Sequence, residues 1–213
     1  MPARSLLRTT SIVTDPSGAA TPLLRIALPV GSIALSSAVL GGGLGPRQQV
    51  ASLTVSSSFS GDPVAWLAAC GIGGDGLVGM MTAVDVRSAT DAVDEAVEVV
   101  ATVGVGWPTY AAAPDGTGSP WTPGTINVVA YLPERLTDAA LVNAVITATE
   151  AKAQALAEAG VPGTGTASDA ICIACPAGPP ADDQAALYGG PRSRWGAPLA
   201  RAVHAAVRAG LHP

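Results

Sequence analysis

The chain has 213 residues, of which 48% are hydrophobic and 13% charged, with a formal net charge of −5 and an isoelectric point near 4.8. This length suits a single domain with a buried core, and the apolar content argues against wholesale disorder. The acidic balance, without a basic patch, excludes the common nucleic-acid-binding classes. No apolar run reaches the roughly 18 residues of a membrane span, and residues 1–15 lack the apolar core of a signal peptide.

The N-terminal half carries short apolar runs between glycines and prolines, a pattern typical of strands and turns. The alternation in residues 50–59 indicates a sheet with one solvated or ligand-facing side. Gly41–Gly45 is predicted to be a loop, without the spacing and lysine of a phosphate-binding loop. Asp62 and Pro63 predict the N-cap and first turn of a short helix. The predicted strands are residues 23–28, 32–40, 49–57, 77–83 and 96–104.

The C-terminal half predicts alternating strands and helices after a flexible stretch at residues 111–124. Thr137 is the expected N-cap of a long helix that ends near Ala159, where Gly160 and Pro162 follow. A polar loop then leads to Asp169. We therefore expect one α/β domain with a mixed β-sheet flanked by α-helices. The remaining predicted elements are strands 125–131 and 170–175, a loop at 176–194 and a helix at 195–209.

The three cysteines, Cys70, Cys172 and Cys175, form no disulfide framework, which fits a reducing, cytoplasmic compartment. Cys172 and Cys175 have the spacing of a redox or metal pair. However, they fall in a predicted strand, where residues three apart point to opposite faces. No second cysteine pair or nearby histidine completes a zinc site. We therefore interpret them as core residues.

Lys152 is the one lysine in a chain with ten arginines, and it lies on the long predicted helix. Helical spacing places it in an apolar stripe with Leu141, Val145, Thr149 and Leu156, opposite Asn143, Thr147, Glu150, Gln154 and Glu158. Two interpretations are open. The side chain can extend along the helix so that its ammonium reaches water, or it can be buried as a compact cation whose pKa moves readily.

Three segments resemble the adenosylcobinamide amidohydrolases of the CbiZ family: GTINVVAYLPERLTDAALVNAVITATEAKAQAL (124–156), GTGTASDAICIACP (163–176) and WGAPLARAVHAAV (195–207). The agreement covers roughly the last ninety residues and is looser around MMTAVDV (80–86). The resemblance implies hydrolysis of the amide between a corrin side chain and its aminopropanol tail. That reaction releases adenosylcobyric acid for corrinoid salvage.

One departure from the family leaves alternatives open. Residues 188–196, YGGPRSRWG, stand where the family has a turn with threonine and histidine. A corrinoid-binding protein of the same fold without hydrolase activity is therefore the competing hypothesis. A third is an amidohydrolase that acts on a different bulky amide.

Hydrolysis of an unactivated amide needs an activated attacking group, a stabilised oxyanion and a proton for the departing amine. Asp169 is the candidate general base or else a carboxylate that shapes its loop, and Lys152 is the candidate for the oxyanion or proton transfer. Glu150 is a candidate only if its polar face lines a cleft. An attacking water and a threonine nucleophile both stay open. The candidate substrate-binding residues are Thr125, Asn127, Thr149, Thr164, Thr166 and Ser168.

The resemblance implies a corrinoid as the small-molecule partner, in a wide cleft with apolar walls. The tryptophans, Trp66, Trp107, Trp121 and Trp195, are candidates for stacking against it or for filling the core. We expect no cofactor and no protein-bound metal, because histidines, cysteines and carboxylates do not cluster in the sequence. His204 is expected beside the core and His212 in the terminal tail. Whether the chain forms a homo-oligomer stays open.

Overall fold

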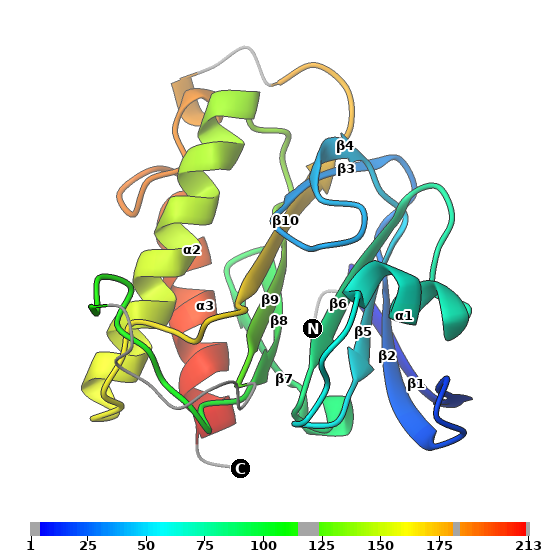
Figure 1. The fold of residues 1–213 in the computed structure, drawn as a ribbon. Helices are drawn as coiled ribbons and strands as arrows, with labels where there is room; N and C mark the ends of the chain where they lie inside the picture. Colours follow the sequence, from blue (N-terminus) through cyan, green and yellow to red (C-terminus); the bar gives the residue numbers. More distant parts are fainter. Residues whose placement is uncertain (1–4, 115–123, 181–183, 212–213) are drawn as a thin grey trace.

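The protein is built from two β-sheets that pack face to face, with helices on both outer sides (Figure 1). A computed structural model describes residues 5–114, 124–180 and 184–211. The predicted α/β class, with mixed sheets flanked by helices, is confirmed, but the strands divide between two sheets. No helix within the described ranges is long and apolar enough to cross a membrane.

The first sheet has six strands in the order β4-β3-β10-β9-β8-β7. β10 and β9 run parallel, and every other neighbouring pair is antiparallel. β9 is buried along its whole length, as its uninterrupted apolar sequence INVVAY favours. The strands are β4 (Gly43–Pro46), β3 (Ser32–Ser36), β10 (Ala170–Pro176), β9 (Ile126–Tyr131), β8 (Val97–Val103) and β7 (Thr90–Asp94).

The second sheet has four strands in the order β1-β2-β5-β6. The parallel pair β5 and β6 is connected through helix α1 (Pro63–Ala69), and Asp62 caps α1 as predicted, accepting hydrogen bonds from the Val64 and Ala65 amides at 2.8 and 3.2 Å. The strands are β1 (Leu7–Thr14), β2 (Ala20–Ala27), β5 (Gln49–Thr54) and β6 (Leu77–Thr82).

The structure of the N-terminal half differs from the sequence predictions at several strands, among them β7, which was not predicted. β1 was not predicted, because its residues LRTTSIVT are almost all exposed and lack an apolar face. The predicted loop Gly41–Gly45 contributes most of β4, which pairs with β3 at the sheet edge. Gly41 and Gly43 take φ values of 67° and 79°, so the glycines shape the entry to an edge strand rather than an open loop.

Helices α2 (Asp138–Glu158) and α3 (Gly196–Leu211) cover the outer face of the six-stranded sheet. Thr137 caps α2 as predicted, accepting a hydrogen bond from the Ala140 amide at 3.2 Å, and Gly160 follows the helix with φ of 73°. α2 packs on both the sheet and α3, so its buried face is wider than the predicted stripe. Thr147 is buried, contrary to prediction, whereas Thr149 is exposed.

Apolar side chains form three layers. One lies between α2, α3 and the six-stranded sheet, a second between the two sheets, and a third between the four-stranded sheet and α1. Cys172 belongs to the layer between the sheets and Cys175 to the helix layer, which confirms that they point to opposite faces of β10. Burial raises the pKa of Cys172 to about 12, as expected for a packed thiol.

Candidate active site

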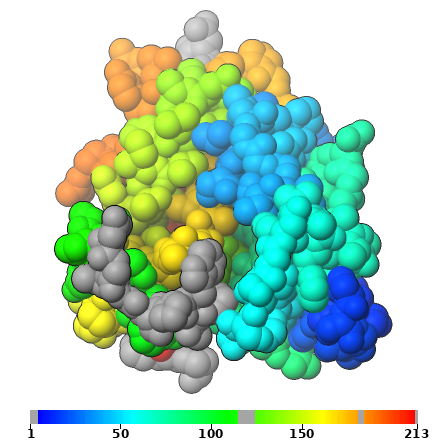
Figure 2. Space-filling view, in the orientation of Figure 1, coloured from blue at the N-terminus to red at the C-terminus, as the bar shows by residue number. Residues whose placement is uncertain are grey.

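A cavity of about 680 Å³ opens between the two sheets. Its walls come from the ends of β6, β9 and β10 and from the loops after β3 and β5. Figure 2 shows the surface hollowed between the cyan segment that follows β5 and the yellow segment that precedes β10. The cavity therefore brings together residues that lie more than a hundred positions apart in the chain.

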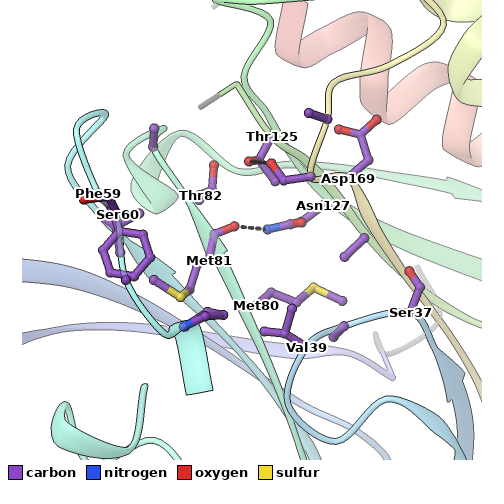
Figure 3. Close-up of a pocket in the computed structure, with 18 residues that line it drawn as sticks. Ser37, Val39, Phe59, Ser60, Met80, Met81, Thr82, Thr125, Asn127 and Asp169 are labelled. Atoms are coloured by element: carbon purple, nitrogen blue, oxygen red, sulfur yellow. Dashed lines mark hydrogen bonds between the residues drawn. The ribbon is translucent and has the colours of Figure 1, made fainter. Parts of the chain in front are cut away.

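The cavity has an apolar wall and a polar end (Figure 3). Val55, Phe59, Met80 and Met81 supply much of the apolar wall, from the four-stranded sheet and the loop after β5. The polar end is formed at the starts of β9 and β10. Its side chains are Thr125, Asn127, Ser168 and Asp169, all of them predicted site residues.

Asp169 is held by four hydrogen-bond donors. Its Oδ1 accepts from the Ile126 amide at 2.8 Å and from the Thr166 hydroxyl at 2.5 Å. Its Oδ2 accepts from the Thr166 amide at 3.1 Å and from Lys152 Nζ, with which it forms an ion pair. Four bonds fill the acceptor positions of a carboxylate. Asp169 thus fastens the loop before β10 to the start of β9 while one side of it lines the cavity.

Lys152 is buried, with 5% of its surface exposed, so the interpretation that it reaches water is wrong. The side chains of Lys152 and Asp169 are 6% and 10% exposed, and the ammonium lies behind the carboxylate. Gly165 passes directly over the pair. A Cβ there would lie 2.4 Å from Asp169 Oδ2 and 2.5 Å from Lys152 Nζ, so this position requires the absence of a side chain.

Two hydroxyl groups meet at the rim of the cavity. Thr125 Oγ1 and Ser168 Oγ lie 2.7 Å apart, and Ser168 also donates to the Gly124 carbonyl at 3.3 Å. Because the Ser168 proton is directed to that carbonyl, Thr125 donates to Ser168. The pair places two polar oxygens beside Asp169 and joins the starts of the parallel strands β9 and β10.

Asn127 lies on β9, two residues after Thr125, and is likewise 3% exposed. Its Nδ2 donates to the Met81 carbonyl at 3.0 Å, across the gap between the sheets (Figure 3). Its Oδ1 is buried and has no hydrogen-bond partner among the described residues. Asn127 therefore presents an unused acceptor at a cavity wall.

The other predicted site residues lie outside the cavity lining. Glu150 and Thr149 are exposed on α2, and Thr149 Oγ1 donates back to the Val145 carbonyl at 2.9 Å. Thr164 is exposed and accepts from the Ala111 amide at 3.0 Å, whereas Thr166 supports Asp169 from behind. Lining residues that the sequence reasoning missed include Ser37, Phe59, Met80, Met81 and Thr82. The signal for the last three was the weaker family agreement at residues 80–86.

The turn at residues 188–196 packs against α2 and α3 rather than at the cavity. Thr147 Oγ1 donates to the Gly189 carbonyl at 2.8 Å, and Gly196 fits closely against the carbonyls of Gly189 and Gly190. Trp195 is buried and donates to Glu134 Oε2 at 2.7 Å, with the Arg194 guanidinium 4.3 Å above its ring. None of the residues 188–196 is among those that line the cavity.

The tryptophans and histidines of the described segments also lie outside the lining. Trp66 packs edge-on against Phe59, with ring centroids 5.2 Å apart, and Trp107 is exposed. His204 Nε2 lies 2.8 Å from Glu158 Oε2, where α3 meets the end of α2. Trp121, His212 and residues 115–123 of the predicted flexible stretch fall outside the described residues. Within the described ranges, no three or more histidines, cysteines and carboxylates gather as they would around a metal ion.

A cavity between two sheets, with a carboxylate, a buried cation and hydroxyls at one end, is a site suited to hydrolysis. Comparison with known proteins is consistent with this class. Residues 6–213 match the adenosylcobinamide amidohydrolase (CbiZ) family, and the chain belongs to that family.

Two curated relatives carry the name adenosylcobinamide amidohydrolase. The protein from Halobacterium salinarum is 46% identical over 99 residues, which cover 46% of this chain and 39% of the relative. The protein from Methanosarcina mazei is 39% identical over 93 residues, which cover 41% of this chain and 46% of the relative. The matched segment thus spans less than half the length of either relative.

Proposed function

We propose that this protein hydrolyses the amide between the corrin side chain and the aminopropanol tail of adenosylcobinamide, releasing adenosylcobyric acid for corrinoid salvage. Family membership supports this reaction, and the observation that carries the proposal is the polar end of the cavity. There Thr125, Ser168 and Asp169 converge at the edge of an apolar wall. The buried free cysteines, Cys70, Cys172 and Cys175, support a reducing, cytoplasmic location.

The shape of the cavity suits a tail rather than a whole ring. A volume of about 680 Å³ lies within the range of small-molecule sites. In this proposal the side chain with the scissile amide enters between the sheets, while the broad ring stays at the mouth. The methionines and Phe59 then contact the apolar parts of the tail, and the reacting carbonyl faces the hydroxyl pair.

The charged pair supplies the chemistry in this proposal. Asp169 is the general base for an attacking water, and it then passes the proton that it took to the departing amine nitrogen when the C–N bond breaks. Lys152 supplies the counter-charge from behind. The four donors to Asp169 require that one give way before it takes a proton, and the Thr166 hydroxyl can do so by rotating about its side chain. Thr125 then turns its hydroxyl proton from Ser168 to the oxyanion, and Ser168 can turn its own from the Gly124 carbonyl to the same oxygen. Glu150 receives no role, because it is exposed on α2 away from the cavity.

The test is to incubate the purified chain with adenosylcobinamide and follow the release of aminopropanol. We expect turnover by the wild type, and a loss of at least a hundredfold in Asp169→Asn, in line with the removal of a general base. Glu150→Gln is the matched control on α2 and should retain wild-type rates. Binding without release would favour the corrinoid-binding alternative. A protein that neither binds nor cleaves adenosylcobinamide would overturn the assignment.

That alternative has lost its structural motivation. It rested on the absence of histidine from residues 188–196, and those residues pack against α2 and α3 instead of lining the cavity. The hydrolase is therefore the function that we propose.

A further inference from the structure

Asn127 is a buried polar side chain whose orientation is set by the protein. The Met81 carbonyl can only accept a hydrogen bond, so the Asn127 group 3.0 Å from it is the amide nitrogen. The amide oxygen is therefore directed elsewhere. The side chain comes from the face of β9 that looks toward the four-stranded sheet, and it lines the cavity.

The Asn127 oxygen lacks a partner among the described residues, although only 3% of the residue is exposed. A buried acceptor without a donor is unfavourable, and native proteins rarely keep one without a reason. A second unpartnered atom, Thr102 Oγ1, belongs to the residue directly opposite on β8, but Thr102 does not line the cavity. Of the two residues, Asn127 is therefore the one that lies beside a ligand in the cavity.

The missing donor has a definite chemistry. A carbonyl-type oxygen accepts an N–H or O–H group, and the bond to Met81 prevents the Asn127 side chain from turning its nitrogen to the cavity instead. Thr125 lies two residues earlier, directly before β9, and an extended chain places it on the same face about 6–7 Å away. A trans secondary amide directs its N–H and its carbonyl oxygen to opposite sides. One such amide can therefore meet Asn127 at one end and the hydroxyl pair at the other.

We infer that Asn127 Oδ1 accepts a hydrogen bond from the N–H of the scissile amide, and so selects secondary amides over esters at this site. The inference rests on the proposed function, because it names the reacting amide as the ligand. Asn127 fixes which way the amide enters: its nitrogen toward Asn127 Oδ1, its carbonyl toward Thr125 and Ser168. An ester places an oxygen at the same point, where it faces Asn127 Oδ1 without a proton between them.

The test compares adenosylcobinamide with its ester analogue, in which oxygen replaces the amide nitrogen. The ratio of kcat/KM for amide over ester is measured in each variant, so the intrinsic reactivity of the two bonds cancels between proteins. In Asn127→Leu we expect this ratio to fall on the order of tenfold, the size of one hydrogen bond. An unchanged ratio would overturn the inference while leaving the proposed hydrolase in place.

Two further variants separate the acceptor from the contact with Met81. Asn127→Asp keeps an acceptor oxygen at this position, so its ratio should stay closer to that of wild type than the ratio of Asn127→Leu does. Thr102→Val removes the neighbouring hydroxyl outside the cavity and should leave the ratio unchanged. A fall in Thr102→Val equal to that in Asn127→Leu would contradict the assignment. If Asn127→Leu does not unfold cooperatively on heating, and so is not properly folded, the same comparison is made with Asn127→Ala.

Equilibrium binding separates this inference from the proposed function. If the wild type cleaves neither compound, the hydrolase assignment fails, yet the affinities still test Asn127. Wild type should then bind the amide about tenfold more tightly than the ester, and Asn127→Leu should bind both alike. Equal affinities of wild type for the two compounds would overturn the inference as well.

Discussion

Lys152 and Asn127 are both buried polar side chains beside the same cavity, yet the protein satisfies them to different degrees. Lys152 faces a carboxylate, and that carboxylate has all its acceptor positions filled. Asn127 uses its nitrogen and leaves its oxygen unpaired. The Lys152–Asp169 pair is a closed arrangement: its hydrogen bonds are complete within the protein, and it can hold the loop before β10 in place by itself. The hydrogen bonding of Asn127 is complete only when something else enters the cavity.

The comparison also separates two kinds of candidate residue. A charge that is fully paired inside the protein is needed for the shape of the site whether or not it reacts. A half-satisfied group gains its last hydrogen bond from a ligand. Mutations in the closed arrangement should therefore affect stability first, and mutations of Asn127 should affect the choice of ligand.

The largest expected effect is that of Lys152→Met. Removal of the ammonium leaves Asp169 as a buried carboxylate without its cation, and breaking such a pair costs about 3–5 kcal/mol. We expect the free energy of unfolding in urea to fall by that amount, and turnover to fall with it. Lys152→Met combined with Asp169→Asn should recover part of the stability, because no unpaired charge remains. A single variant as stable as wild type would show that the pair is not needed for folding.

Gly165→Ala should have the next largest effect, because it disturbs the same pair without altering either charge. Its new methyl group would lie within 2.5 Å of both Lys152 Nζ and Asp169 Oδ2. Overpacking of this kind typically costs about 1–3 kcal/mol, measured again by urea unfolding. The matched control is Gly73→Ala, where a Cβ meets nothing within 4 Å, and it should stay within about 0.5 kcal/mol of wild type. Equal effects in the two variants would contradict the close approach at Gly165.

The sequence predicted one side of the site well and the other poorly. Thr137, Gly160 and the apolar run of β9 are local signals, so β9, α2 and β10 were placed nearly to the residue. The opposite wall depends on contacts between distant parts of the chain. Met81 meets Asn127 across 46 residues, and no local pattern encodes that approach.

The predicted face of α2 was displaced for a related reason. Alanines at positions 144, 148, 151 and 155 count little in an apolar stripe, yet they are the residues that allow close packing on the sheet and α3. Leu141, Lys152 and Leu156 were placed correctly, but Thr147 was assigned to the polar side. The apolar periodicity of α2 predicts the direction in which its largest side chains point. It does not predict the width of the buried face, because both the sheet and α3 cover the helix.

Thr147→Val should have the smallest effect on stability and none on catalysis. The substitution keeps the shape of the side chain but leaves the Gly189 carbonyl without the hydroxyl that donates to it at 2.8 Å. Loss of one buried hydrogen bond costs about 1 kcal/mol, which a urea titration can resolve. Because residues 188–196 do not line the cavity, aminopropanol release by the folded variant should match wild type. A variant that folds normally but loses turnover would show that this turn reaches the substrate. The absence of histidine from residues 188–196 would then again support the corrinoid-binding alternative.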